Sequence, residues 1–137
     1  MSQTKFKIID HSDKILAEFA SKNADRMNDA VNIVRNKVLV TLSGNRSGIE
    51  YFVPGTSKLY QASNPGEAPA TATGALRQSI FGQTTKTGYK VIGKVGTDRE
   101  YGKHLEYGTY RIAARPWLRV SAMAVWDKVK SALARRY

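Results

Sequence analysis

The chain has 137 residues, a length typical of one domain that buries an ordinary core. Hydrophobic residues make up 42% and charged residues 24%, which indicates a globular protein and excludes a disordered one. There is no cysteine, which excludes disulfides, thiolate nucleophiles and cysteine-based zinc sites.

The formal net charge is +11, and it is uneven: residues 1–60 carry +3 and residues 61–137 carry +8. Such a balance is typical of a protein that meets a polyanion, either nucleic acid or an acidic protein face. No dense block of basic residues is present. A basic surface that only contacts solvent is therefore as good an interpretation as a surface that binds a polyanion. The chain starts without a secretory signal and contains no run of about 18 apolar residues. We therefore expect synthesis in the cytoplasm and no membrane partner.

Residues 12–42 are predicted to form one long amphipathic helix. Apolar side chains recur at steps of three and four, which places them on one face of a helix. They are Ala20, Ala24, Met27, Val31, Val34, Val38 and Leu42.

A hairpin and a long loop are predicted next. Ile49, Tyr51 and Val53 alternate, a Pro-Gly pair breaks the run, and Leu59 and Tyr60 resume it, which is typical of two strands joined by a turn. Residues 63–73, SNPGEAPATAT, favour neither helix nor strand because two prolines remove amide donors. A loop of this length usually has a function.

The remaining segments predict a short helix, a second hairpin and two further helices. Leu76 and Ile80 lie four apart in the short helix after Thr73. Residues 80–95 alternate as a hairpin that turns near residues 87–88, and residues 99–109 favour one or two helical turns. Residues 115–137 predict an amphipathic helix with Pro116 in its first turn and Leu118, Ala122, Val125, Val129 and Leu133 on one face.

This order predicts an α+β fold in a single domain, residues 1–137, with the long first helix and the last helix packed on a small antiparallel sheet. We expect a hairpin arm and loop, about residues 50–75, to protrude from it. The inward positions of the pattern predict that Tyr51, Tyr89, Tyr101 and Trp117 belong to the core, while Trp126 fits either the core or the surface.

Groups that carry catalysis are nearly missing from the sequence. His11 and His104 lie far apart, and neither belongs to a metal-ligand pattern. No nucleophile elbow and no phosphate-binding loop occur. We therefore expect no enzyme, no cofactor and no metal site.

Three segments carry a resemblance. They are ASNPGEAPATATGALRQSI at 62–80, YGKHLEYGT at 101–109 and AARPWLRVSA at 113–122. In order and approximate spacing they resemble the tail-completion (neck) protein family of long-tailed bacteriophages, and the similarity covers most of residues 12–135. Gly102 departs from the family pattern, in which alanine is common, and we expect it to loosen that short helix without changing the fold.

The resemblance implies a structural protein of the virion neck, without enzymatic activity or cofactor. It implies a homo-oligomeric ring, commonly a hexamer, between the head–tail connector or stopper protein and the tail terminator or tail-tube protein, close to packaged DNA. Two alternatives stay open. One is a tail terminator or head-closure (stopper) protein of the same neck, and the other is a free nucleic-acid-binding protein supported by charge alone.

In such a ring we expect the three segments to supply the contacts between subunits. Arg77 and Glu67 are candidate interface charges, and Arg115 is a candidate ion-pair partner of Glu106; each is equally interpretable as a solvated charge. The full set of expected interface residues is Pro65, Gly66, Glu67, Pro69, Thr73, Gly74, Leu76, Arg77, Glu106, Tyr107, Gly108, Thr109, Arg115, Pro116 and Trp117.

Overall fold

The computed structural model describes residues 9–71 and 74–135. The elements are α1 (Ser12–Thr41), β1 (Glu50–Phe52), β2 (Leu59–Gln61), α2 (Ala75–Ser79), β3 (Phe81–Thr87), β4 (Lys90–Gly96), α3 (Glu100–Tyr107), α4 (Leu118–Ala124) and α5 (Trp126–Leu133). The strands form two separate antiparallel pairs, β1–β2 and β3–β4. This arrangement confirms the predicted α+β class.

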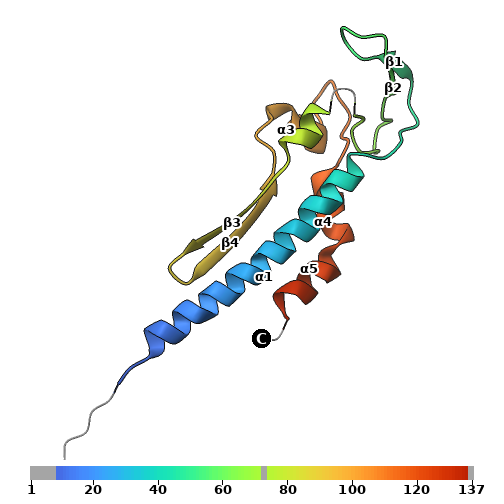
Figure 1. Ribbon diagram of the computed structural model, residues 1–137. Helices are drawn as coiled ribbons and strands as arrows, with labels where there is room; N and C mark the ends of the chain where they lie inside the picture. Colours follow the sequence, from blue (N-terminus) through green and yellow to red (C-terminus); the bar gives the residue numbers. More distant parts are fainter. Residues whose placement is uncertain (1–8, 72–73, 136–137) are drawn as a thin grey trace, which may run out of the picture.

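The long helix α1 is the spine of the molecule. Its 30 residues span about 45 Å. The β3–β4 hairpin lies along one side of α1, and α4 and α5 lie along another side (Figure 1). The predicted apolar face is the one that these elements cover, and Ala20, Val31, Val38 and Leu42 are buried on it.

The β3–β4 hairpin lies directly on α1 because two of its residues have no side chain. A Cβ atom on Gly93 would lie 2.6 Å from Sδ of Met27 and 2.7 Å from Cγ2 of Val31. A Cβ atom on Gly82 would lie 2.7 Å from Cγ1 of Val31. Both glycines are therefore positions of close approach between a strand and a helix.

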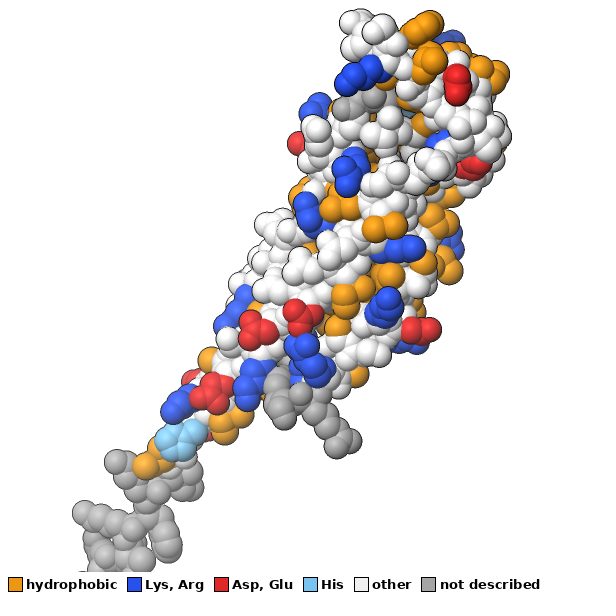
Figure 2. Space-filling view, turned by 45° about the vertical axis from the view of Figure 1, so that its right-hand side comes forward, with side chains coloured by type: hydrophobic (Ala, Val, Ile, Leu, Met, Phe, Trp, Pro, Cys, Tyr) orange, Lys and Arg blue, Asp and Glu red, His pale blue; other side chains and the backbone are white. Residues whose placement is uncertain are grey.

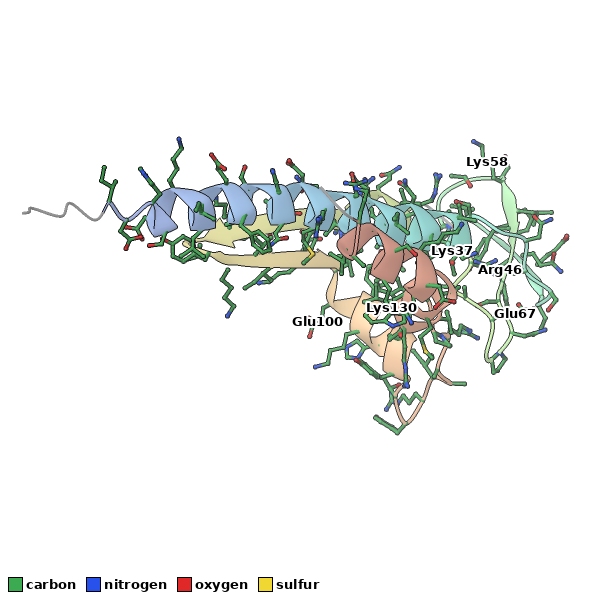
Figure 3. All side chains as sticks on the ribbon, turned by 90° about the horizontal axis from the view of Figure 1, so that it is seen from below. Lys37, Arg46, Lys58, Glu67, Glu100 and Lys130 are labelled. Carbon is green, nitrogen blue, oxygen red and sulfur yellow. The ribbon has the colours of Figure 1, made fainter. Side chains whose placement is uncertain are left out.

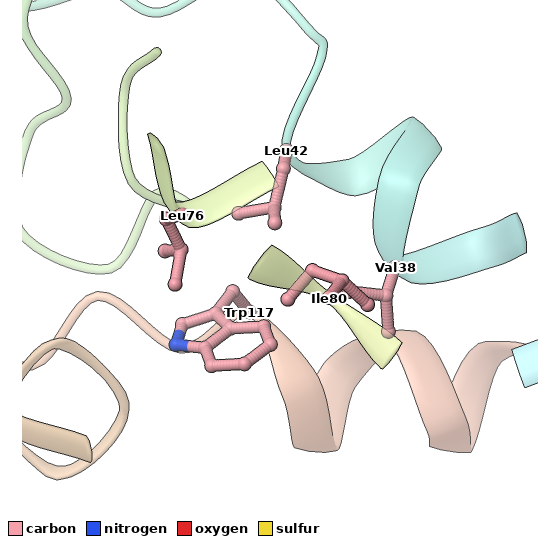
Figure 4. Packing of buried hydrophobic residues seen from close by; sticks show 5 residues of the cluster. All are labelled: Val38, Leu42, Leu76, Ile80 and Trp117. Carbon is pink, nitrogen blue, oxygen red and sulfur yellow. The ribbon is translucent and has the colours of Figure 1, made fainter. Parts of the chain in front are cut away.

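The main core lies at the end of α1, where the chain leaves the helix. Five buried side chains meet there: Val38, Leu42, Leu76, Ile80 and Trp117 (Figure 4). They come from α1, α2 and the segment before α4, so residues far apart in the sequence share one cluster. A second cluster joins Ala30 of α1 to Val125 and Val129.

The predicted last helix is interrupted. It divides into α4 and α5 at Val125, whose φ of −111° and ψ of 11° leave the helical region. Val125 and Val129 are nevertheless buried, so the predicted inward face was right and only the continuity was wrong. Neither proline nor glycine marks the break, and nothing in the sequence pattern pointed to it.

Three of the four aromatic residues predicted for the core are exposed. Tyr51, Tyr89 and Tyr101 lie on the surface, and Trp117 alone of the four is buried. Alternation along a strand identifies two faces, but it does not show whether another layer covers either face. Tyr51 lies on β1–β2, which extends beyond the end of α1 (Figure 1), and Tyr89 lies in the β3–β4 turn.

Gly93→Ala is expected to lower the free energy of unfolding by about 1–3 kcal/mol, because the added methyl group is forced against Met27 and Val31. Thermal unfolding followed by circular dichroism measures this change. Gly96→Ala is the matched control on the same strand, because its Cβ atom would meet Phe81 at an ordinary 3.7 Å. Equal melting temperatures for the two variants would contradict the close packing of β4 on α1.

Candidate functional site

The three family-like segments meet at one end of the molecule, around the side chain of Trp117. The indole Nε1–H of Trp117 donates a hydrogen bond of 3.0 Å to the carbonyl oxygen of Gly102. The same ring packs in the main core with Leu76. One buried tryptophan thus joins the third segment to the first and the second.

Gly102 has a packing role that the sequence did not reveal. It is buried, and a Cβ atom there would lie 2.7 Å from Cγ2 of Thr97 and 3.3 Å from both Leu76 and Trp117. The structure does not test the expectation that Gly102 loosens α3. The glycine lets α3 lie close to the core, and a larger residue has no room.

The carboxylate of Glu106 caps the start of α4. It accepts hydrogen bonds from the backbone N–H groups of Trp117 at 2.7 Å, Leu118 at 2.9 Å and Arg119 at 3.0 Å. These amides have no partner inside the helix, and a carboxylate also complements the positive end of the helix dipole. Glu106 of α3 therefore holds α4 in place.

The predicted ion pair between Arg115 and Glu106 is not the contact that forms. Arg115 is joined to α3 through its backbone N–H, which donates to the carbonyl oxygen of Leu105 at 2.7 Å. Its Nε atom is buried without a hydrogen-bond partner. The expected link between the Glu-Tyr-Gly-Thr turn and the last helix exists, but backbone amides supply the donors.

The proline-rich loop of residues 62–71 is tied to the end of α1 by Arg46. The guanidinium donates to the carbonyl oxygens of Ala68 at 2.6 Å, Pro69 at 3.1 Å and Thr41 at 2.5 Å. The hydroxyl of Thr71 donates to the carbonyl oxygen of Leu42 at 2.5 Å. Because the prolines leave this loop without a regular ladder, a single cation satisfies its carbonyl groups instead.

Glu67 fixes the other side of the same loop. Its carboxylate accepts hydrogen bonds from the Asn64 backbone N–H at 2.9 Å, from the Ser47 backbone N–H at 3.2 Å and from the Ser47 hydroxyl. The Ser47 hydroxyl and the two amides hold the pKa of Glu67 below its ordinary value of 4.5. Figure 3 shows Arg46 and Glu67 at the end of the molecule that carries the arm.

The segment expected to protrude therefore divides into two parts. Residues 50–61 form the β1–β2 hairpin, which extends away from the domain and is here named the arm (Figure 1). Residues 62–71 lie against the domain, with Ser63 and Pro69 buried. On the arm Phe52 is 66% exposed and its cross-strand partner Leu59 is 56% exposed.

The other expected interface residues differ widely in exposure. Leu76 and Trp117 are core residues, which leaves them a supporting role. Thr73 lies outside the described residues. The expected residues that are exposed and therefore open to a partner are Pro65, Gly66, Arg77, Tyr107 and Thr109. Those that are partly buried are Glu67, Gly74, Glu106, Gly108, Arg115 and Pro116.

Sequence reasoning missed Arg46 and the surface side chains beside Thr109. Arg46 lies in a polar stretch after a helix, where an arginine usually contacts only solvent. The sequence therefore does not indicate that it binds the loop. Tyr110 is 90% exposed, and the Arg111 guanidinium lies 5.1 Å from the centre of its ring. With Tyr107 this loop adds exposed aromatic area, and hydrophobic side chains are scattered along the face shown in Figure 2.

No group of three or more His, Asp or Glu side chains within residues 9–71 and 74–135 is arranged to hold a metal ion. Within the same residues no helix is both long and apolar enough to cross a bilayer. Comparison with protein-family models, with curated proteins and with solved structures found no match to this chain.

Glu106→Ala is expected to lower the free energy of unfolding by about 1–3 kcal/mol, because three amides at the start of α4 lose their acceptor. Glu106→Gln should lie between Glu106→Ala and the wild type, because an amide oxygen still accepts. Lys103→Ala, an exposed change on the same helix, is the control and should stay within about 0.5 kcal/mol of the wild type. Chemical denaturation measures all three values.

A double-mutant cycle separates this cap from an ion pair. With Arg115→Met as the second change, the coupling energy between positions 106 and 115 should be close to zero. A large favourable coupling would show that the guanidinium, and not the backbone, is the partner of Glu106.

The lowered pKa of Glu67 predicts how the loop responds to acid. Hydrogen bonds in the folded protein stabilise the ionised carboxylate of Glu67, and the unfolded chain lacks them. The contribution of this carboxylate to the stability of the fold is therefore complete above pH 4.5. It is lost as the pH falls through the pKa of Glu67 in the folded state, which is lower than 4.5. The amide proton signals of Ser47 and Asn64 in nuclear magnetic resonance should titrate with a midpoint below 4.5. Glu67→Gln should abolish that titration. A midpoint above 4.5, or a titration that survives the substitution, would contradict the assignment.

Proposed function

We propose that this chain is a structural protein of the neck of a long-tailed bacteriophage virion, where it forms a homo-oligomeric ring and completes the tail for joining to the head. The resemblance of residues 62–80, 101–109 and 113–122 to the tail-completion family supports this proposal. Its expected neighbours are the connector or stopper protein on the head side and the terminator or tube protein on the tail side.

One observation carries the proposal furthest: the three family-like segments form a single packed end, from which an apolar arm extends. Arg46, Glu67 and Glu106 hold irregular backbone there in one conformation. Each side of the arm is about six residues long, which gives a reach of about 20 Å. An ordered base with an exposed apolar extension suits a protein that joins neighbours, because little ordering entropy is lost on binding.

The exposed apolar side chains also support assembly. Exposed large hydrophobic side chains lie on the arm, on the loop beside Thr109 and on α1, α4 and α5. Exposed apolar surface of this extent usually marks contacts with other proteins.

The arm is tested by removing its apolar side chains while keeping the hairpin. Phe52→Ser with Leu59→Ser should leave the melting temperature of the purified protein nearly unchanged, because both side chains already face water. Phage that carry the double variant should accumulate filled heads and separate tails, counted by electron microscopy. Phe52→Tyr with Leu59→Met is the matched control, since it keeps the apolar area and should keep joining near the wild-type level.

Other outcomes distinguish the alternatives. Joined, infectious particles at wild-type yield would overturn the role of the arm. Tails of uncontrolled length would favour a terminator, and heads that lose their DNA would favour a head-closure protein. A purified protein that binds DNA, with an affinity that falls steeply as salt rises, would favour the nucleic-acid-binding alternative.

A further inference from the structure

We propose that one copy of this chain docks the start of its α1 helix into an apolar groove on the next copy. The inference rests on the proposed ring and identifies the two surfaces that would build it. The docking segment is residues 9–19. The groove lies between α1, β4 and the α4–α5 pair.

In the docking segment, Ile15 lies exposed on a face of α1 that is covered elsewhere. Every residue from 9 to 19 is exposed, with Ile15 at 62% and Leu16 at 43%. Ile15 lies 18 residues, or about five helical turns, before Ile33, so the two side chains share one face. Ile33 packs against the cluster of Val125 and Val129, whereas nothing in the described chain gives Ile15 a comparable cover.

Among the described elements, α5 ends beside Arg26 of α1. The Arg26 guanidinium donates to the carbonyl oxygen of Leu133, the last residue of α5, at 3.2 Å. Ile15 is 11 residues before Arg26, or about 16 Å further along α1. Ile15 and Leu16 are therefore exposed on a part of α1 that α5 does not reach.

The groove is a hollow whose lining is almost entirely apolar. Its floor comes from α1, and β4 and α4–α5 form its walls, enclosing about 380 Å³. Trp126 is 55% exposed on its wall. Its lining includes Met27, Val31, Val95, Ala122, Trp126 and Leu133.

Charge complementarity selects the occupant. Residues 9–19 contain three carboxylates, Asp10, Asp13 and Glu18, and one lysine, for a net charge of −2 in a chain of +11. The elements beside the groove are basic: residues 81–96 carry three lysines and no acid, and residues 118–133 carry a net charge of +2. Acidic side chains lie toward the end of the molecule where α1 begins (Figure 2). An acidic, apolar helix fits a basic-rimmed apolar groove in both shape and sign.

The contact must join two copies. Ile15 and the groove floor at Met27 lie on the same straight helix, about 18 Å apart, so a chain cannot place its own segment in its own groove. The two surfaces differ, which makes the contact heterologous. Each copy then has one docking segment and one groove. When the same contact repeats from copy to copy, it closes a ring if the rotation between neighbouring copies allows it.

Disulfide trapping tests the contact, because the chain has no native cysteine to interfere. Ile15→Cys protein is mixed with Ala122→Cys protein under mild oxidation, both as concentrated purified protein and in phage particles assembled from the two variants. A mixed dimer should form at least about tenfold faster than with Val40→Cys, an exposed control on α1, in place of Ile15→Cys, and the rate should fall as salt rises. Circular dichroism checks that each variant is folded. Leu133→Cys, at the far end of the groove, replaces Ala122→Cys if that variant unfolds.

The absence of a mixed dimer in both solution and particles would overturn the docking contact. Cross-linking of Ile15→Cys to itself would overturn it too, since that product reports a symmetric contact. Neither result depends on the arm variants, whose effect on head–tail joining tests the proposed function by itself. Loss of joining without any cross-link would therefore keep the neck function and reject this interface.

Discussion

The length of α1 is the constraint on which the rest of the molecule depends. At about 45 Å it is roughly twice as long as the seven-residue strands β3 and β4, and α5 covers only part of another side. The described strands and α5 are each too short to cover α1 along its whole length. The main core is therefore concentrated at one end, around Trp117 and Val38, and apolar side chains are left exposed at the other.

Single polar side chains hold the irregular backbone at the packed end. Arg46 satisfies carbonyl groups of the proline-rich loop, Glu67 satisfies amides of the same loop, and Glu106 satisfies the first amides of α4. In each case a charged group bonds to backbone that has no ladder or helical partner, which is a stronger bond than a neutral pair makes. The three family-like segments thus owe their ordered shape to a few charge-assisted contacts, and an ordered surface binds a neighbour at a lower entropic cost.

The sequence predicted the helices and strands better than the contacts that they make with one another. The periodicity of α1 and the alternation in β3–β4 identified both correctly, because local geometry repeats along the chain. Tyr51 was misplaced because alternation does not show whether a second layer exists, and neither proline nor glycine marks the break at Val125. The predicted contact between Glu106 and the last helix exists, but the donors are backbone amides and not the Arg115 side chain. Every residue except proline has a backbone amide, so the sequence does not indicate which amides Glu106 contacts. Arg46 gave no signal at all, since its partners are carbonyl groups distant in the chain.

A cryo-electron microscopy reconstruction of the head–tail junction of the intact particle tests the central claim most directly. We expect a ring of copies of this chain between the connector and the tail tube, with residues 50–61 of each copy in contact with a neighbouring protein. Particles that join heads to tails without any density for this chain at the junction would contradict it.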